Sequence, residues 1–318
     1  MSKAIIQEKY SFNEDEDLIN SGAFGQIFRI KDKNVKTEYV LKKIVKSKTD
    51  PESFKNEIDF LKEIKGTNII NIIDYFSDKN DKFYYIILEK MDGDLNEMLK
   101  ANNNKMTSNM IRKIFKQLNS ALDIMYKKQK CHRDLKPDNI LYSYTNDDKT
   151  DFIVKLGDFG LATDLYVTQS TDAGTYIYKA PEIGTEKHHT NKCDLYSIGV
   201  ILYKLKTGEF IFEGKNMIDY LINKKNGKLK KTKNNKLIDD DDNLNDLISN
   251  LVVNAPDMRL KWNDYFNHPF FKENDNQKLI NDNNFLKNKN INCETEIQKL
   301  NDQNKQLKET NNSGKIFF

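Results

Sequence analysis

The chain has 318 residues and a hydrophobic fraction of 38%, which is enough for one large domain or two ordinary ones. Its 51 Lys and Arg nearly balance 48 Asp and Glu. This positive excess is too small to indicate binding to nucleic acid or to a membrane surface. Three cysteines without CxxC spacing and the absence of a long apolar run favour reduced thiols and a cytoplasmic protein, with the nucleus also possible.

Short apolar segments separated by turn residues predict strands joined by tight turns from about Leu18 to Ile44. The period changes between Pro51 and Lys65, where apolar residues recur at helical spacing. These residues are Phe54, Ile58, Leu61 and Ile64. The segments "NIINIIDYF" and "KFYYIILEKM" then return to strand character. The first ninety residues therefore predict a sheet with one inserted helix.

After Asp92 the pattern becomes mainly helical. The segment "SNMIRKIFKQLNSALDIMYKK" carries an apolar stripe that favours core packing over a ligand role. The stripe consists of Met110, Ile114, Leu118, Leu122 and Met125. The segment "CDLYSIGVILYKLKTG" is apolar almost all round and predicts a buried helix ending at Gly208. Residues 224–242 hold a Lys-rich run followed by "DDDD", which predicts a solvated loop, with a docking surface as the less favoured interpretation.

A glycine-containing turn and a strand lysine are the first candidates for chemistry. The turn "NSGAFGQI", residues 20–27, lies between two predicted strands, and Gly22 and Gly25 would let the backbone approach phosphate oxygens. No helix follows, so the Rossmann and Walker A interpretations fail, and an ordinary hairpin turn stays open. Lys42 needs an anionic partner if it points inward, and Glu57 on the following helix can supply one. The strand pattern does not decide which of two adjacent lysines points inward.

Two further segments concentrate oxygen ligands and a candidate base. "CHRDLKPDNIL", residues 131–141, places Asp134 and Asn139 in one loop, and "VKLGDFGLA", residues 154–162, adds Asp158. Two carboxylates and an amide oxygen are the hard ligands that Mg²⁺ prefers. A carboxylate free of metal could orient and deprotonate a hydroxyl. The set fits phosphoryl transfer, where positioning and charge neutralisation dominate, and a solvated turn is the alternative.

Taken in order, these motifs resemble the signature set of the eukaryotic protein kinases over residues 13–271. The resemblance implies an α+β fold of two lobes: a small β-rich N-terminal lobe (13–91) with one key helix, and a larger, mainly helical C-terminal lobe (92–271). Residues 1–12 would be an N-terminal extension. Residues 272–318 would be an Asn/Lys-rich tail, partly disordered or helical, that could bind a further partner. The family resemblance also implies a monomer that uses ATP, Mg²⁺ and a protein substrate.

The resemblance implies a role for each candidate site residue. Asp134 matches the catalytic base, and Lys136 the residue that steadies the γ-phosphate. Lys42 matches the lysine that holds the α and β phosphates, with Glu57 as its partner. The implied Mg²⁺ ligands are Asn139 and Asp158. The remaining ATP-binding positions are Asn20, Ser21, Gly22, Ala23, Phe24, Gly25, Ile27, Val40, Glu89 and Met91, with Leu88 as the gatekeeper.

The resemblance also implies residues that hold the site in place, and the chain departs from the family pattern at a few positions. Glu182 of "APE" would pair with Arg259, and Asp194 would anchor the backbone of the catalytic loop. Asn20 stands where the first glycine of the loop is usual, and Asn tolerates positive φ better than most residues. The segment "YSYTNDDKTDF", residues 142–152, is longer than typical and is interpreted as a surface hairpin. None of these departures touches a catalytic atom.

The motifs "HRDLKPDN" and "GTYIYKAPE" resemble serine/threonine kinases more than tyrosine kinases. Arg133 beside the base suggests that a phosphate on Thr168, Ser170 or Thr171 orders the activation segment through a charge-assisted pair. The alternative is that these hydroxyls are ordinary loop residues. The rival function is a pseudokinase or scaffold that binds nucleotide or partners without transfer. Scaffolds commonly lose one of the essential Lys or Asp residues, and this chain keeps all of them.

Overall fold

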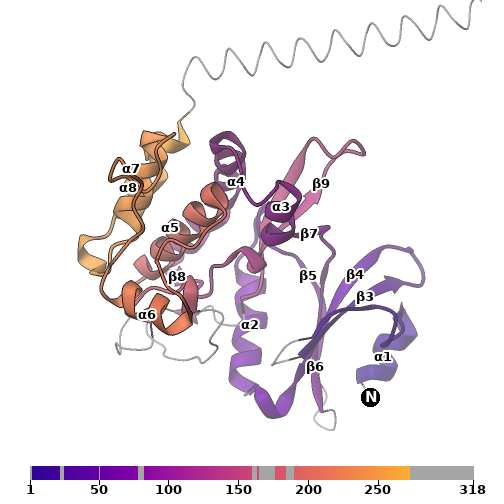
Figure 1. Ribbon diagram of the computed structural model, residues 1–318. Coiled ribbons are helices and arrows are strands. Elements are labelled where there is room, and N and C mark those ends of the chain that lie inside the picture. Colours follow the sequence, from indigo (N-terminus) through magenta and orange to yellow (C-terminus); the bar gives the residue numbers. More distant parts are fainter. Residues whose placement is uncertain are drawn as a thin grey trace, which may run out of the picture. The chain divides into compact units, whose positions relative to one another are not determined.

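The computed structural model describes residues 2–21, 25–49, 51–77, 82–159, 163–164, 176–183 and 190–272 (Figure 1). Residues 1–271 form one compact unit. Three groups of positions named above lie outside the described residues. They are Gly22, Ala23 and Phe24 of the glycine-rich turn, the hydroxyl residues Thr168, Ser170 and Thr171, and the tail from residue 273 onward.

An antiparallel sheet makes up most of the first ninety residues. Its strands are β1 (Tyr10–Ser11), β2 (Leu18–Ser21), β3 (Gly25–Asp32), β4 (Glu38–Val45), β5 (Ile72–Ser77) and β6 (Phe83–Glu89). The strand order is β1-β3-β4-β6-β5, with β2 paired to the start of β3. In the register of the central strands, Lys42 of β4 lies opposite Ile27 of β3 and Ile86 of β6. Because side chains alternate along a strand, Lys42 and Lys43 face opposite sides of the sheet.

Two helices cover the two faces of this sheet (Figure 1). Helix α2 (Pro51–Glu63) packs on one face, where Phe54 stacks on Tyr84 with ring centroids 4.1 Å apart. Helix α1 (Ser2–Lys9) and β1 cover the other face through Ile6 and Tyr10, which belong to one cluster with Phe28. The predicted helix inserted between strands is therefore confirmed as α2. Helix α1 precedes the sheet and was not predicted, because its eight residues are too few for an apolar period to show.

The second part of the unit is mainly helical. Its helices are α3 (Leu95–Ala101), α4 (Ser108–Lys127), α5 (Lys192–Thr207), α6 (Met217–Lys225), α7 (Asp242–Leu251) and α8 (Trp262–Phe266). The predicted α4 stripe is buried except at Met110, which packs against the edge of the core. Helix α5 is buried on nearly every side and ends at Gly208, whose φ of 76° suits glycine. No helix within the described ranges is long and apolar enough to cross a membrane.

Short strands connect the helical part to the sheet. Strands β9 (Ile140–Tyr144) and β10 (Phe152–Leu156) pair antiparallel, which confirms the interpretation of residues 142–152 as a hairpin. Strand β7 (Gly93–Asp94) pairs with β9, and β8 (Lys130–Cys131) pairs with β11 (Thr163–Asp164). Leu156 bridges Ile69, which lies just before β5, so the two lobes share a backbone contact. The expected two-lobe α+β architecture is confirmed.

The Lys-rich run is only partly the predicted solvated loop. It begins inside α6, where Lys224 is buried, and Leu237 and Ile238 near its end are also buried. Lys224 is accommodated because its Nζ donates hydrogen bonds to the backbone carbonyls of Tyr176 and Ile177. A charge pattern alone does not reveal such a contact, since the partner atoms lie about fifty residues away in the sequence.

Candidate active site

Of the two adjacent lysines of β4, Lys42 is the one that contacts Glu57, although Lys43 is the more buried of the two. The Lys42 Nζ lies 2.8 Å from Glu57 Oε1 on α2 and 2.9 Å from Asp158 Oδ1 in the loop after β10. Lys43 instead reaches Glu14 at 3.0 Å. Burial would lower the pKa of Lys42, but the carboxylates of Asp158 and Glu57 outweigh this effect and raise it. The sequence left open which of the two lysines contacts Glu57, and in the structure it is Lys42. The two carboxylates keep Lys42 charged.

Asp158 is held in an uncommon backbone conformation. Its φ is 53°, in the left-handed region that few non-glycine residues adopt. The neighbouring Phe159 fixes this turn by packing against Phe60 of α2 and His132, with ring centroids 5.1 Å away in each case. The charge of Lys42 holds the pKa of Asp158 well below its usual range. The Asp158 side chain is 47% exposed, so its ionised carboxylate can be reached from solvent.

The two carboxylate oxygens of Asp134 differ in their hydrogen bonds. Its Oδ2 accepts from Lys136 Nζ at 2.9 Å and from Asn139 Nδ2 at 3.2 Å. Among the residues that the structure describes, no hydrogen-bond partner is found for its buried Oδ1. Because an unsatisfied buried carboxylate oxygen is costly, this atom is suited to accept a hydrogen bond from a donor such as a hydroxyl. Asn139 turns its Nδ2 toward Asp134 and so leaves its own Oδ1 for a cation.

The backbone of this loop is fixed from α5. The carboxylate of Asp194, in the first turn of that helix, accepts from His132 N at 2.7 Å and from Arg133 N at 2.9 Å. Arg133 has a φ of 64°, which the two hydrogen bonds help to hold. The expected anchor is present. The Cys131 thiol adds a third donor 3.3 Å from Asp194, a contact that no sequence signal indicated.

A buried ion pair supports the segment 176–183. Arg259 Nη1 lies 2.8 Å from Glu182 Oε1, and the two side chains are 0% and 3% exposed. Arg259 also donates to the carbonyl oxygens of Lys192 and Val253. The pair expected from the family resemblance is therefore present and ties this segment to the start of α5 and the end of α7.

The family resemblance implies that Glu89 and Met91 lie on the hinge between the lobes and offer backbone hydrogen bonds to adenine. The Glu89 carboxylate accepts from Lys155 Nζ at 2.6 Å and from Asn71 N at 2.7 Å, so its side chain is already engaged. Its backbone N–H donates to Asn71 O at 3.1 Å. Lys155 was missed in the sequence, although a lysine within the apolar strand "IVKL" is an available signal. We keep Met91 as a prediction.

The glycine-rich turn and the adenine roof are described in part. Asn20 and Ser21 lie exposed on β2, while Ile27 and Val40 lie half-buried on the same sheet face as Lys42. A Cβ atom at Gly25 would lie 2.1 Å from the Lys43 carbonyl oxygen, so this position requires glycine for packing alone.

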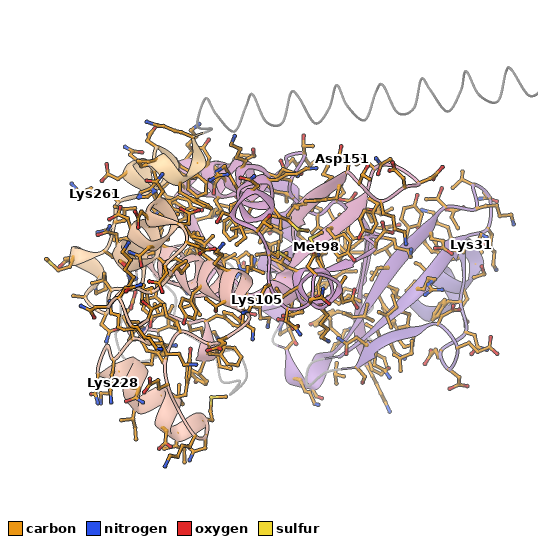
Figure 2. All side chains as sticks on the ribbon, turned by 45° about the horizontal axis from the view of Figure 1, so that its top comes forward. Lys31, Met98, Lys105, Asp151, Lys228 and Lys261 are labelled. Carbon is orange, nitrogen blue, oxygen red and sulfur yellow. The ribbon has the colours of Figure 1, made fainter. Side chains whose placement is uncertain are left out.

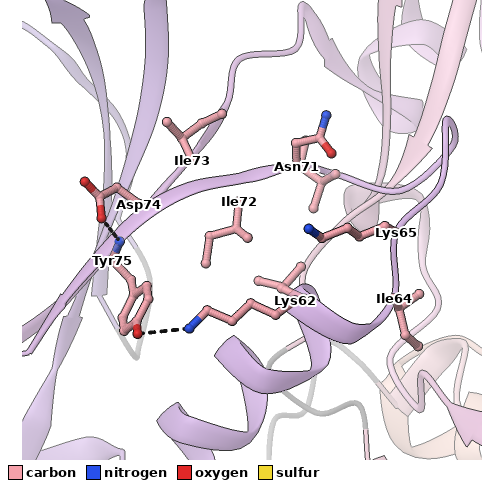
Figure 3. A pocket seen from close by; sticks show the side chains of 10 residues that line it. Lys62, Ile64, Lys65, Asn71, Ile72, Ile73, Asp74 and Tyr75 are labelled. Atoms are coloured by element: carbon pink, nitrogen blue, oxygen red, sulfur yellow. Dashed lines mark hydrogen bonds between the residues drawn. The ribbon is translucent and has the colours of Figure 1, made fainter.

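A separate cavity of about 420 Å³ lies between α2 and β5, away from these groups (Figure 3). Its lining comes from the last turns of α2 and from residues 70–75. Lys62 spans one side of it, with its Nζ 2.9 Å from Tyr75 Oη. None of the predicted catalytic, metal or nucleotide residues lines this cavity.

Comparison with known proteins identifies the family. A family model described as protein kinase domain matches residues 13–271. The chain belongs to the protein kinase family. It is 34% identical over 268 residues to serine/threonine-protein kinase atg1 of Dictyostelium discoideum, covering 81% of this chain and 39% of that protein.

Two further relatives show the same similarity. Calcium-dependent protein kinase 4 of Plasmodium falciparum is 33% identical over 287 residues, which cover 85% of this chain and 51% of the relative. Cell division control protein 2 homolog 3 of Trypanosoma brucei brucei is 34% identical over 223 residues, which cover 68% of this chain and 69% of the relative. The chain thus matches about half or less of the length of the first two relatives.

The donor chemistry of this kinase domain fits Mg²⁺. Asp158 supplies an ionised, partly exposed carboxylate, and Asn139 supplies an amide oxygen. Hard oxygen donors of this kind suit Mg²⁺, which keeps several waters and shares phosphate oxygens of its substrate. The same region holds the charged Lys42 and Lys136, whose ammonium groups can face phosphate.

Proposed function

We propose that the chain is a serine/threonine protein kinase that transfers the γ-phosphate of ATP to hydroxyl groups of protein substrates. The observation that carries this proposal is Asp134 Oδ1, a buried carboxylate oxygen that has no hydrogen-bond partner within the described part of the chain. A substrate hydroxyl would donate its proton to this atom while its oxygen attacks the γ-phosphorus and ADP leaves. The second carboxylate oxygen stays fixed by Lys136 and Asn139, which orients the base.

The other charged groups would position and neutralise the phosphates. Lys42, kept charged by Glu57 and Asp158, would bind the α and β phosphates, and Lys136 would bind the γ-phosphate. Mg²⁺ held by Asp158 and Asn139 would offset negative charge on the phosphate oxygens.

The choice of a Ser or Thr hydroxyl is supported by the similarity to serine/threonine-protein kinase atg1 and by the motif "HRDLKPDN". We further propose that phosphate on Thr168, Ser170 or Thr171 switches the activity by pairing with Arg133, whose backbone is fixed by Asp194. Replacing all three hydroxyl residues by Ala should lower the rate of transfer at least tenfold. An unchanged rate would exclude this form of regulation.

The decisive experiment compares two aspartates of one loop. Asp134→Asn should lower transfer of labelled phosphate from Mg-ATP to a generic Ser/Thr substrate by about 10²–10⁴-fold. Asp138→Asn is the matched control, because Asp138 is exposed, and it should keep nearly the full rate. Equal rates in all three proteins would remove Asp134 from the mechanism. Nucleotide binding without transfer in the unmodified chain would favour the scaffold function.

A further inference from the structure

Helix α6 presents an apolar face to solvent. Ile218 is 70% exposed and Ile222 is 52% exposed, and Met217 and Leu221 beside them are also exposed. The spacing i, i+1, i+4 and i+5 places these four side chains on one side of the helix, here called the α6 face. Single exposed apolar residues are normal, but a contiguous group on one helix indicates an interaction site.

The opposite side of α6 is fixed to the segment 176–183. Tyr220 Oη donates to Ile177 O at 3.3 Å, and the buried Lys224 donates to the carbonyls of Tyr176 and Ile177. The helix therefore cannot rotate to bury the α6 face without losing these hydrogen bonds. The same contacts fix α6 to residues 176–183, so the α6 face points away from that segment and stays open to a partner.

A run of lysines borders the α6 face. Seven lysines and no acidic residue occur between Asp219 and Asp239. Within the described chain, four exposed members form no ion pair: Lys225, Lys228, Lys231 and Lys233. Residues 225–236, here called the lysine loop, stay close to the helix because Lys228 N donates to Asn223 O at 2.8 Å. Figure 2 shows Lys228 at the edge of the helical part of the molecule.

We propose that the α6 face and the lysine loop dock an acidic, amphipathic segment of the protein substrate. Apolar side chains of the segment would cover Ile218 and Ile222, and its carboxylates would face the lysine loop. This occupant is favoured by charge complementarity, since a second copy of the same surface would bring two lysine loops together at a cost. The proposal rests on the proposed kinase function, because it names where that function recruits its substrate.

The binding test uses a random-peptide display library selected on the full chain. Selected peptides should carry net negative charge and apolar residues at i and i+4. They should bind Ile218→Ser/Ile222→Ser at least tenfold more weakly, and binding should weaken as salt rises. Val35→Ser/Met258→Ser, which changes exposed apolar residues elsewhere, is the matched control and should bind normally. Absence of selected peptides, selection of basic ones, or equal binding by the α6 variant would overturn the proposal.

Charge is tested separately from the apolar contact. Lys225→Glu/Lys228→Glu/Lys231→Glu should weaken binding of the selected peptides at least tenfold. The control is Lys100→Glu/Lys105→Glu/Lys261→Glu, which makes the same charge change at exposed lysines elsewhere in the helical lobe. It should have little effect on binding. Equal weakening by both triple variants would show that only net charge matters and would overturn the proposed surface.

The link to catalysis is tested by fusing a selected peptide to a generic Ser/Thr substrate. The fusion should lower KM at least tenfold with kcat unchanged, and Ile218→Ser/Ile222→Ser should remove this gain without changing the rate on the unfused substrate. No transfer to either substrate would reject the kinase function but leave the binding result standing. Binding without a lower KM would reject substrate docking. If the unmodified chain sediments as a dimer and Ile218→Ser/Ile222→Ser sediments as a monomer, the α6 face binds a second copy of the chain instead.

Discussion

Lys42 and Lys43 are adjacent residues of β4 whose side chains lie on opposite faces of the sheet. One can therefore be replaced as a control for the other. Lys42 contacts Glu57 and Asp158 in the candidate site, whereas Lys43 contacts Glu14 and lies 4.5 Å from the centroid of the Phe83 ring. Lys42→Met should lower phosphate transfer about 100-fold or more, because it removes the cation aimed at phosphate. Lys43→Met should change the rate less than about threefold.

Initial rates at several Mg-ATP concentrations, together with melting temperatures, test this pair. The melting temperatures show whether either variant loses activity through unfolding. A Lys43→Met rate as low as that of Lys42→Met, with both proteins folded, would contradict the assignment of Lys42 to the site.

The buried pair of Arg259 and Glu182 gives a stability prediction. Arg259→Met leaves the Glu182 carboxylate buried without its cation, which should lower the free energy of unfolding by about 3–5 kcal/mol. The exposed pair of Lys127 and Asp123 is the control, and Lys127→Met should cost no more than about 0.5 kcal/mol. Urea denaturation of both variants measures the difference. Similar costs for the two would show that burial does not set the strength of the Arg259 pair.

Sequence motifs located most of the candidate site but not all of its contacts. Asp134, Asn139 and Asp158 stand in short ordered patterns, so their residue types and spacing were sufficient to find them. The contact between Glu89 and Lys155 spans 66 positions and depends on how β10 lies behind the hinge. A one-dimensional pattern contains no information on such a pair.

Helix α1 provides the first prediction at the scale of an element. Ile6 is fully buried against the sheet face that carries Phe28 and Leu41. Ile6→Ala should therefore lower the free energy of unfolding by about 2–4 kcal/mol, from lost burial and the cavity left behind. Gln7→Ala, at an exposed position of the same helix, should have little effect. Equal stability of both variants in urea denaturation would show that α1 does not hold the sheet.

Helix α6 gives a prediction on pH. Burial, helped by the charge of Lys179, lowers the pKa of Lys224 from 10.5 to about 7. Between these values the unfolded chain binds a proton that the folded chain does not, so stability rises with pH in this window. Below pH 7 both states bind the proton and the dependence ends.

Lys224→Met should remove this part of the pH dependence. The stability of the unmodified chain relative to the variant should rise by up to about 4 kcal/mol between pH 7 and pH 10. Lys225→Met, at the exposed neighbouring position, should keep the slope of the unmodified chain. Urea denaturation across this pH range is the measurement, and parallel slopes for all three proteins would contradict a neutral Lys224.

Long periodic elements were predictable and short ones were not. Three of the four predicted apolar residues lie in α2, and Ile64 follows its last residue. These residues and the stripe of α4 repeat often enough to specify both a helix and its buried side. By contrast, α1 and the two-residue strands β1, β7, β8 and β11 are too short to show a period. They form because tertiary contacts cover them, as Ile6 and Tyr10 illustrate.

At the scale of the whole molecule, the candidate site is also a junction between the lobes. Lys42 of the sheet bonds Asp158 of the helical part, and Glu89 bonds Lys155 behind the hinge. Asn68 adds a hydrogen bond of 2.7 Å to the Val154 carbonyl. A nucleotide whose phosphates lie against Lys42 and near Asp158 would contact both lobes and should therefore stabilise the unit as a whole.

ATP binding should raise the stability of the folded chain, and this rise can be used to test whether binding depends on Mg²⁺. ATP at about 100 times its dissociation constant adds roughly 2.7 kcal/mol to the free energy of unfolding, which corresponds to about 5 °C in melting temperature. The increase should need Mg²⁺ and disappear on chelation, because Asp158 and phosphate repel each other without the cation. Asp158→Asn should lose the Mg²⁺ dependence, whereas Asp138→Asn, at an exposed site, should keep it. An ATP effect equal with and without Mg²⁺ in the unmodified chain would show that Asp158 does not bind the metal.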